Sequence, residues 1–183
     1  MPAPTWSALT VTAKGGILRV IQTKCQISQA FLPTTTAVAP PHFEYDAIWG
    51  TGATASVITQ HVVDQCGLQP TGMTQVHSVR GTDIVETYLV NILLPNRVGF
   101  VKFTVTKGVL QNAQVLIGMD VISTGDFSIT NKDGHTVCSF RTPSQKHIDY
   151  VKEHEDLLQQ GRFSHGGSHK DRNKRHKTFG KRK

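Results

Sequence analysis

The chain has 183 residues, a formal net charge of +7 and only three cysteines. This length suits one ordinary domain with an appendage, and no stretch approaches the roughly 18 to 20 apolar residues that a membrane-spanning helix needs. The three cysteines form no CxxC pair, which argues against a disulfide framework and a cysteine zinc site; together with an N-terminus unlike a secretory signal, they predict a cytoplasmic protein with reduced thiols.

The first half of the chain reads as short β-rich runs separated by turn residues. Residues 9–13 and 17–31 have the β-branched content of strands, and Gly15-Gly16 between them predicts a tight turn. Residues 34–49, broken by a proline pair, form an extended run into a glycine-rich stretch. Residues 59–70 are the first helical candidate, with Val62, Val63 and Cys66 on one side and Gly67 as the stop.

The second half continues the β pattern and then changes character. We expect strands over 74–95 and 98–110 around a turn at Arg80-Gly81, an apolar strand over 113–122 ending in glycine, and a hairpin over 126–141 that turns at 132–134. A weakly amphipathic helix follows, with Ser144 as its N-cap and Gly161 closing it. The prediction is an all-β domain over 1–143, a C-terminal amphipathic helix over 144–160 and a disordered basic tail over 161–183.

The positive charge belongs to that tail alone. Residues 161–183 carry +8 and the other 160 residues carry −1. The nine tail cations are Arg162, Lys170, Arg172, Lys174, Arg175, Lys177, Lys181, Arg182 and Lys183. The function of the nearly neutral body should therefore be sought in its shape and pockets.

The stretch AIWGTGATASVI, residues 47–58, is the most informative part of the sequence. A Gly-Thr-Gly turn is weak evidence by itself, because ordinary hairpins contain such turns. With Asp at position 50, however, the run would closely resemble the Asp-Thr-Gly-Ala motif of retropepsin-like aspartic proteases. VLIGMDVI, residues 115–122, resembles the second hallmark of that family, and it follows about 65 residues later. Residues 17–144 as a whole are similar to small bacterial members.

The resemblance implies a closed β-barrel that works as a homodimer on a peptide or protein substrate, with no metal or other cofactor. Each subunit of such a dimer contributes one catalytic Asp loop, and the two carboxylates share a proton. In this sequence Gly50, Thr51 and Gly52 occupy the catalytic loop. Ala53 and a flap hairpin at Val79, Arg80, Gly81 and Thr82 would contact substrate, and Leu116, Ile117 and Gly118 would form the structural motif behind the loop.

Gly50 removes the carboxylate from this chemistry. A homodimer uses the position twice, so both acids of the dyad are lost, and we expect a pseudoenzyme that does not hydrolyse peptides. Asp46 and Asp64 do not lie on the turn, and Asp120 is interpreted as a structural or helix-capping residue. There are two explanations for the glycine. It is a single Asp-to-Gly change that was made deliberately, arose by mutation or is a sequence error; alternatively, the chain is a natural pseudoprotease retained for binding. The otherwise intact motif favours recent loss.

The tail supports an alternative from another functional class. Its cations would attract nucleic-acid phosphates non-specifically through Arg162–Lys183, while Phe163 and Phe179 are its only aromatic residues. A basic tail that only aids solubility or contacts acidic partners is the simpler interpretation. His165, His169 and His176 cluster in the same segment, but no cysteine or acid stands at ligand spacing, so we expect no structural metal site.

Overall fold

A computed structural model describes residues 5–35, 38–78 and 81–164, and the side chains as far as residue 161. The chain divides into two compact units, and the boundary along the sequence falls between Lys146 and His147. None of the helices in the described part is long and apolar enough to cross a membrane. Residues 165–183 of the tail expected at 161–183, with its three histidines, lie outside the described residues, as do the expected flap residues Val79 and Arg80.

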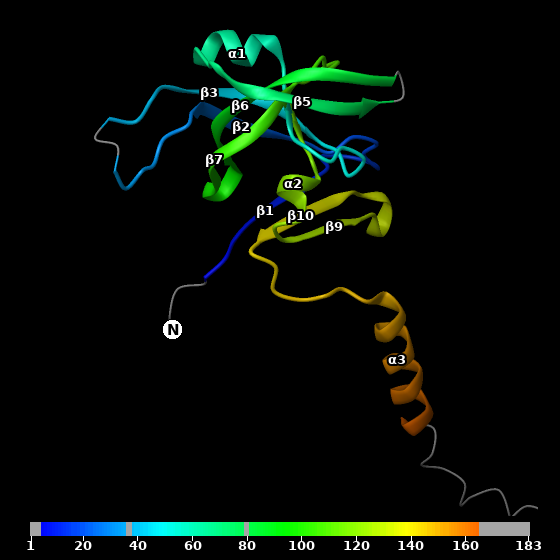
Figure 1. Ribbon diagram of the computed structural model, residues 1–183. Helices are drawn as coiled ribbons and strands as arrows, with labels where there is room; N and C mark the ends of the chain where they lie inside the picture. Colours follow the sequence, from blue (N-terminus) through cyan, green and yellow to red (C-terminus); the bar gives the residue numbers. More distant parts are fainter. Residues whose placement is uncertain (1–4, 36–37, 79–80, 165–183) are drawn as a thin grey trace, which may run out of the picture. The chain divides into compact units, whose positions relative to one another are not determined.

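The first unit is built almost entirely of strands, as predicted (Figure 1). Short helical turns interrupt the strands, and one regular helix, α1, follows the fourth strand. The elements in chain order are β1 (Ser7–Thr12), β2 (Gln22–Gln29), β3 (His42–Trp49), β4 (Val57–Ile58), α1 (Gln60–Cys66), β5 (Pro70–Ser78), β6 (Gly81–Leu94), η1 (Pro95–Arg97), β7 (Val98–Lys107), β8 (Val115–Ile117), α2 (Met119–Ile122), β9 (Asp126–Thr130), η2 (Lys132–Gly134) and β10 (Val137–Thr142).

Six strands close into a barrel. They are hydrogen-bonded in the order β2-β3-β8-β4-β7-β6, and β6 pairs again with β2, with Ile27 opposite Ile92 and Ser28 opposite Asn91. Ile27 and Ile92 point inward and are almost fully buried. Closure leaves no free edge in the ring, which confirms the prediction of an all-β closed barrel. β5 extends the ladder beyond β6, and β1, β10 and β9 form a separate three-stranded sheet.

Several local predictions are confirmed. α1 buries Val62, Val63 and Cys66, and Gly67 ends it in the left-handed conformation at φ 61°. β5 and β6 form the expected hairpin, in which Ser78 pairs with Gly81. β9 and β10 form the second hairpin around η2. In each case the turn and the strands are close in sequence, so the local pattern was sufficient.

Other local predictions are wrong. Gly15-Gly16 does not turn a hairpin, because β1 pairs with β10 while β2 pairs with β3 and β6. The expected strand over 17–31 is regular only over β2, and the expected strand over 113–122 is strand only over β8, after which α2 begins. Ser144 does not cap the last helix, since its hydroxyl binds the carboxylate of Asp126.

The last helix, α3 (Tyr150–Ser164), belongs to the second unit. Asp149 caps it, because its Oδ1 accepts hydrogen bonds from the backbone N–H groups of Val151 and Lys152, both at 3.0 Å. The helix therefore begins later than predicted. It also continues through Gly161, which does not end it.

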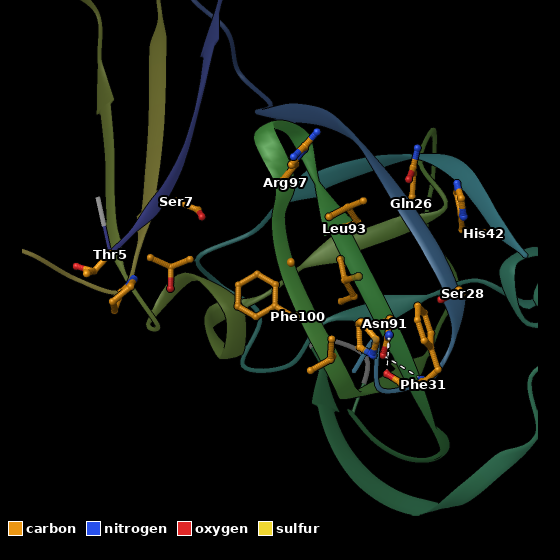
Figure 2. Close-up of a pocket in the computed structure, with 16 residues that line it drawn as sticks. Thr5, Ser7, Gln26, Ser28, Phe31, His42, Asn91, Leu93, Arg97 and Phe100 are labelled. Carbon is orange, nitrogen blue, oxygen red and sulfur yellow. Dashed lines mark hydrogen bonds between the residues drawn. The ribbon is translucent and has the colours of Figure 1, made fainter. Parts of the chain in front are cut away.

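A pocket of about 560 Å³ lies on the outer face of the barrel (Figure 2). It is lined by Gln26 and Ser28 of β2, Asn91 and Leu93 of β6, and Phe100 of β7, among others. These positions lie where β6 pairs with β2 and β7, so the seam that closes the barrel also forms the pocket floor.

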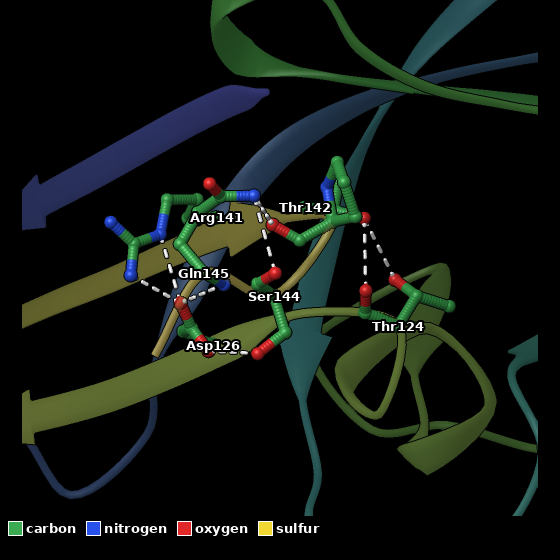
Figure 3. Close-up of polar contacts among 7 residues, drawn as sticks. Thr124, Asp126, Arg141, Thr142, Ser144 and Gln145 are labelled. Atoms are coloured by element: carbon green, nitrogen blue, oxygen red, sulfur yellow. Dashed lines mark hydrogen bonds and ion pairs between the residues drawn. The ribbon is translucent and has the colours of Figure 1, made fainter. Parts of the chain in front are cut away.

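A polar cluster around Asp126 fixes the end of β10 (Figure 3). The carboxylate of Asp126 accepts hydrogen bonds from the Ser144 hydroxyl, the Gln145 N–H at 3.0 Å and Arg141 Nε at 2.9 Å. Beside it the Thr142 hydroxyl donates to the carbonyl of Thr124 at 3.2 Å. The bond from Ser144, followed by those from Gln145 and Arg141, holds the pKa of Asp126 well below its ordinary value.

We expect Asp126→Asn to destabilise the protein at neutral pH. Because the folded-state pKa of Asp126 is lowered, its contribution is fully present above the unfolded aspartate pKa of about 4 and is lost as pH falls toward the lower folded value. Urea unfolding should therefore show a difference between wild type and variant that is largest at neutral pH and shrinks below about pH 4. Asp133→Asn, in the exposed η2 turn, is the control and should show no such difference. A difference independent of pH would contradict this role of the Asp126 charge.

Candidate functional site

The glycine-rich loop, residues 50–56, connects β3 to β4. It begins directly after Trp49, whose ring stacks on Phe127 at 5.6 Å and packs against Phe140 at 5.3 Å between centroids. The indole N–H donates to the Thr23 hydroxyl at 3.1 Å. Trp49 thereby joins the barrel to the strands β9 and β10, and it gives the loop a rigid starting point.

The loop forms a tight turn with an exposed tip. The Gly50 N–H donates to the carbonyl of Ile117 at 3.0 Å, and the Ala53 N–H donates to the carbonyl of Gly50 at 3.2 Å. Thr51 and Gly52 at the tip are exposed, whereas Ala53 is half-buried. The turn therefore presents its backbone and the Thr51 side chain to the outside.

The predicted structural motif lies directly behind this loop. β8 runs parallel to β3, so that Ile48 pairs with Leu116 and Trp49 with Ile117. Beyond the strand, the Met119 N–H donates to the carbonyl of Ala53 at 2.8 Å. The structure thus brings together 50–53 and 116–118, two segments that are far apart in the sequence.

Ser56 is the central contact between the two segments. Its hydroxyl accepts a hydrogen bond from the Gly118 N–H at 3.0 Å and donates to Asp120 Oδ1 at 2.7 Å. The Ser56 N–H donates to Asp120 Oδ2, also at 2.7 Å. Ser56 is fully buried, and its carbonyl accepts the Thr106 N–H at 3.0 Å. Asp120 is therefore a bracing residue of the loop, which agrees with its structural interpretation.

Two glycines of the site differ sharply in what surrounds them. A Cβ on Gly118 would lie 2.6 Å from the carbonyl carbon and oxygen of Ala55, so only glycine permits the close approach. A Cβ on Gly50 would lie 3.6 Å from Leu116 Cδ1, an ordinary contact, and the φ of Gly50 is not in the left-handed region. The fold requires Gly118 but not Gly50.

The expected flap corresponds to the hairpin of β5 and β6. Gly81 begins β6 at φ 125°, and the Thr82 hydroxyl pairs with His77 Nδ1 at 2.9 Å across the hairpin. Both Gly81 and Thr82 are exposed. Within the described residues, no hydrogen bond joins Gly81 or Thr82 to the glycine-rich loop, so their predicted role as substrate contacts stays a prediction.

No carboxylate stands on the loop tip. Residues 50–56 contain no ionisable side chain. Asp46 pairs with Lys24 at 2.8 Å, and the hydrogen bond from Lys24 lowers the pKa of Asp46. Asp64 accepts a hydrogen bond from Gln60 at 2.8 Å within α1. In the part of the chain that the structure describes, no group of three or more His, Cys, Asp or Glu side chains is arranged to hold a metal ion.

The sequence pattern does not indicate which distant residues hold the loop in position. Thr23, Phe127 and Phe140 hold Trp49, and Thr106 holds Ser56, yet none of them stands near residue 50 in the sequence. The outer pocket was also missed, because strand alternation indicates which face is outward but not where that face is hollow.

Comparison with solved structures finds chains of similar fold, all at low identity. A retropepsin-like aspartic protease from Rickettsia conorii is 10% identical, with a TM-score of 0.46 over 78% of this chain and 99% of that one. The Simian Foamy Virus (mac) protease is 13% identical, with a TM-score of 0.37 over 56% and 92%. The retroviral protease-like domain of Ddi1 from Leishmania major is 16% identical, with a TM-score of 0.38 over 61% and 82%. No protein-family model and no curated protein matches the chain.

We expect Gly118→Ala to destabilise the protein by about 1–3 kcal/mol, because the added methyl group would overlap the Ala55 backbone. Gly50→Ala is the matched variant and should change the free energy of unfolding by less than about 0.5 kcal/mol. Urea unfolding of both variants measures the contrast. Equal destabilisation by the two substitutions would contradict the assignment of Gly118, rather than Gly50, as the sterically required glycine.

Proposed function

We propose that the chain is an aspartic endopeptidase scaffold of the retropepsin type that dimerises and binds extended peptides at the Gly50 loop without cleaving them. The observation that carries the proposal is the contrast between an intact, braced loop and an unoccupied side-chain position at its start. A Cβ at Gly50 would make only an ordinary contact with Leu116, so the loop has room for a side chain that the sequence does not supply.

The exposed tip supports the proposed homodimer. Thr51 and Gly52 are exposed on a turn whose Gly50 N–H donates to Ile117 and whose Ala53 carbonyl accepts from Met119. We infer that a second copy of this turn meets it across a two-fold axis. Two position-50 side chains would then face each other across the symmetry axis. With aspartate there, the pair would share one proton, one carboxylate taking a proton from water and the other donating to the peptide carbonyl.

The hairpin of β5 and β6 supports a peptide as the ligand. It is the only part of the sheet in the described residues that extends beyond the closed ring, and β5 leaves an unpaired strand edge (Figure 1). An extended peptide satisfies its backbone groups by pairing with such exposed backbone. On this basis we propose that Gly81 and Thr82, at the start of β6, line the groove. The expectation that Ala53, Val79 and Arg80 also contact the peptide rests on the family resemblance alone.

The decisive test restores the missing carboxylate. Gly50→Asp should gain peptidase activity about 10²-fold or more above the parent protein, with a bell-shaped pH profile in the mildly acidic range, because a proton-sharing dyad is re-formed. Gly50→Asn has nearly the same size but does not ionise, and it should remain inactive. A transition-state-mimicking inhibitor should stop the Asp variant. Cleavage is measured on a mixed peptide library, with sedimentation used to determine the oligomeric state.

Two other results would separate the parts of the proposal. If neither variant cleaves while both sediment as dimers, the groove has lost its catalytic geometry and a binding role is the better account. A parent protein that sediments as a monomer would contradict the shared-site proposal altogether, because one subunit holds only half of the site.

A second candidate function follows from the separation of charge. The tail carries +8 whereas the rest of the chain carries −1, so any affinity for nucleic acid should belong to Arg162–Lys183. We expect deletion of residues 161–183 to abolish binding of a single-stranded RNA oligonucleotide, and binding by the full chain should weaken steeply with salt. Fluorescence anisotropy measures both effects. Neutralising Lys14, Arg19 and Lys132 in the body is the control, and binding that survives the deletion would contradict the tail assignment.

A further inference from the structure

The pocket on the outer face of the barrel has the size of a small-molecule site. Its volume of about 560 Å³ falls within the range of roughly 300–1,000 Å³ that is usual for such sites. None of its lining residues comes from the glycine-rich loop or from Gly81 and Thr82. It is therefore separate from the proposed peptide groove.

The pocket is held in shape by hydrogen bonds within its own wall. Asn91 is 8% exposed, and its Nδ2 donates to the carbonyl of Phe31 at 2.9 Å (Figure 2). Its Oδ1 accepts the Lys102 N–H at 2.8 Å. Asn91 thus fixes Phe31 beside β6. Thr142 and Pro143 line another part of the wall. They directly follow Arg141, which donates a hydrogen bond to the Asp126 carboxylate. Both attachments are hydrogen bonds within the chain itself, so the wall of the pocket is held by the fold.

The floor of the pocket is apolar and in part exposed. Leu93 on β6 is 41% exposed and Val101 on β7 is 50% exposed. Phe100, next to Val101 on β7, also lines the pocket. When an apolar group covers large apolar side chains on the outside of a barrel, apolar surface is removed from water and binding is favoured. The floor therefore favours a ligand with an apolar body.

The ionisable residues that line the pocket favour a ligand with an anionic group at one end. Arg97 and His42 are the only ionisable side chains among the described residues that line the pocket, and the lining contains no carboxylate. Arg97 takes part in none of the ion pairs recorded in the described part of the chain. Its guanidinium has five N–H donors arranged in a fork that suits a carboxylate.

We propose that this pocket binds an amphipathic carboxylate of the medium-chain fatty acid type. The alkyl chain lies on Leu93, Phe100 and Val101, and the carboxylate binds Arg97. The site is independent of residue 50 and of peptide binding, so its test does not depend on the proposed protease scaffold.

The test titrates the full chain with decanoate, below its micellar concentration, and with decanol as the neutral analogue, while amide NMR signals are followed. Decanoate should produce saturable shifts at Asn91, Gly99 and Phe100. Arg97→Gln should weaken decanoate binding about tenfold and leave decanol binding nearly unchanged, because it removes only the charge-assisted bonds. Arg19→Gln, an exposed arginine outside the pocket, is the matched control and should bind like the parent.

The apolar half of the proposal has its own variant. Leu93→Ser should weaken the binding of both decanoate and decanol. If the NMR spectrum of Leu93→Ser shows that this variant is unfolded, Val101→Ser is used in its place. Equal decanoate affinity in Arg97→Gln and the parent would overturn the anion assignment. Shifts confined to the Gly50 loop, or shifts that never saturate, would overturn the pocket assignment.

Discussion

The contact of Ser56 with Gly118 and Asp120 is the constraint on which the barrel and its loop both depend. β4 has only two residues, yet it joins β8 to β7 and so completes the ring. Two residues provide too few ladder hydrogen bonds to hold a strand in place. Ser56, directly before β4, adds several more, since its N–H, hydroxyl and carbonyl are all bonded to Thr106 of β7, to Gly118 or to Asp120. In a fully buried position each of these bonds is costly to lose.

This bracing explains how the glycine-rich loop keeps its shape without a side chain at position 50. The conformation of 50–53 is set by backbone bonds to Ile117 and Met119 and by the anchored Trp49, none of which involves a side chain at position 50. A side chain at position 50 is therefore not needed to hold the loop in this conformation.

The wrong predictions share a cause. Gly15-Gly16 has the composition of a hairpin turn, but the strands that flank it belong to different sheets, since β1 pairs with β10 and β2 pairs with β3. Ser144 has the chemistry of an N-cap, but Asp126 takes its hydroxyl, and Asp149 caps the helix instead. In both cases the local signal was real and a partner distant in sequence decided the outcome.

The sequence by itself determined the elements whose partners are near neighbours: α1 with its Gly67 stop, the two hairpins, and the chemical character of the Gly50 loop. It also determined that residues 50–56 carry no ionisable group, since that is a matter of composition. Only the tertiary structure decided that Gly118 must be glycine while Gly50 need not be, that Asp120 braces the loop, and that the barrel seam is hollowed outside. These properties arise from distances between segments far apart in the chain, which residue types and spacing do not encode.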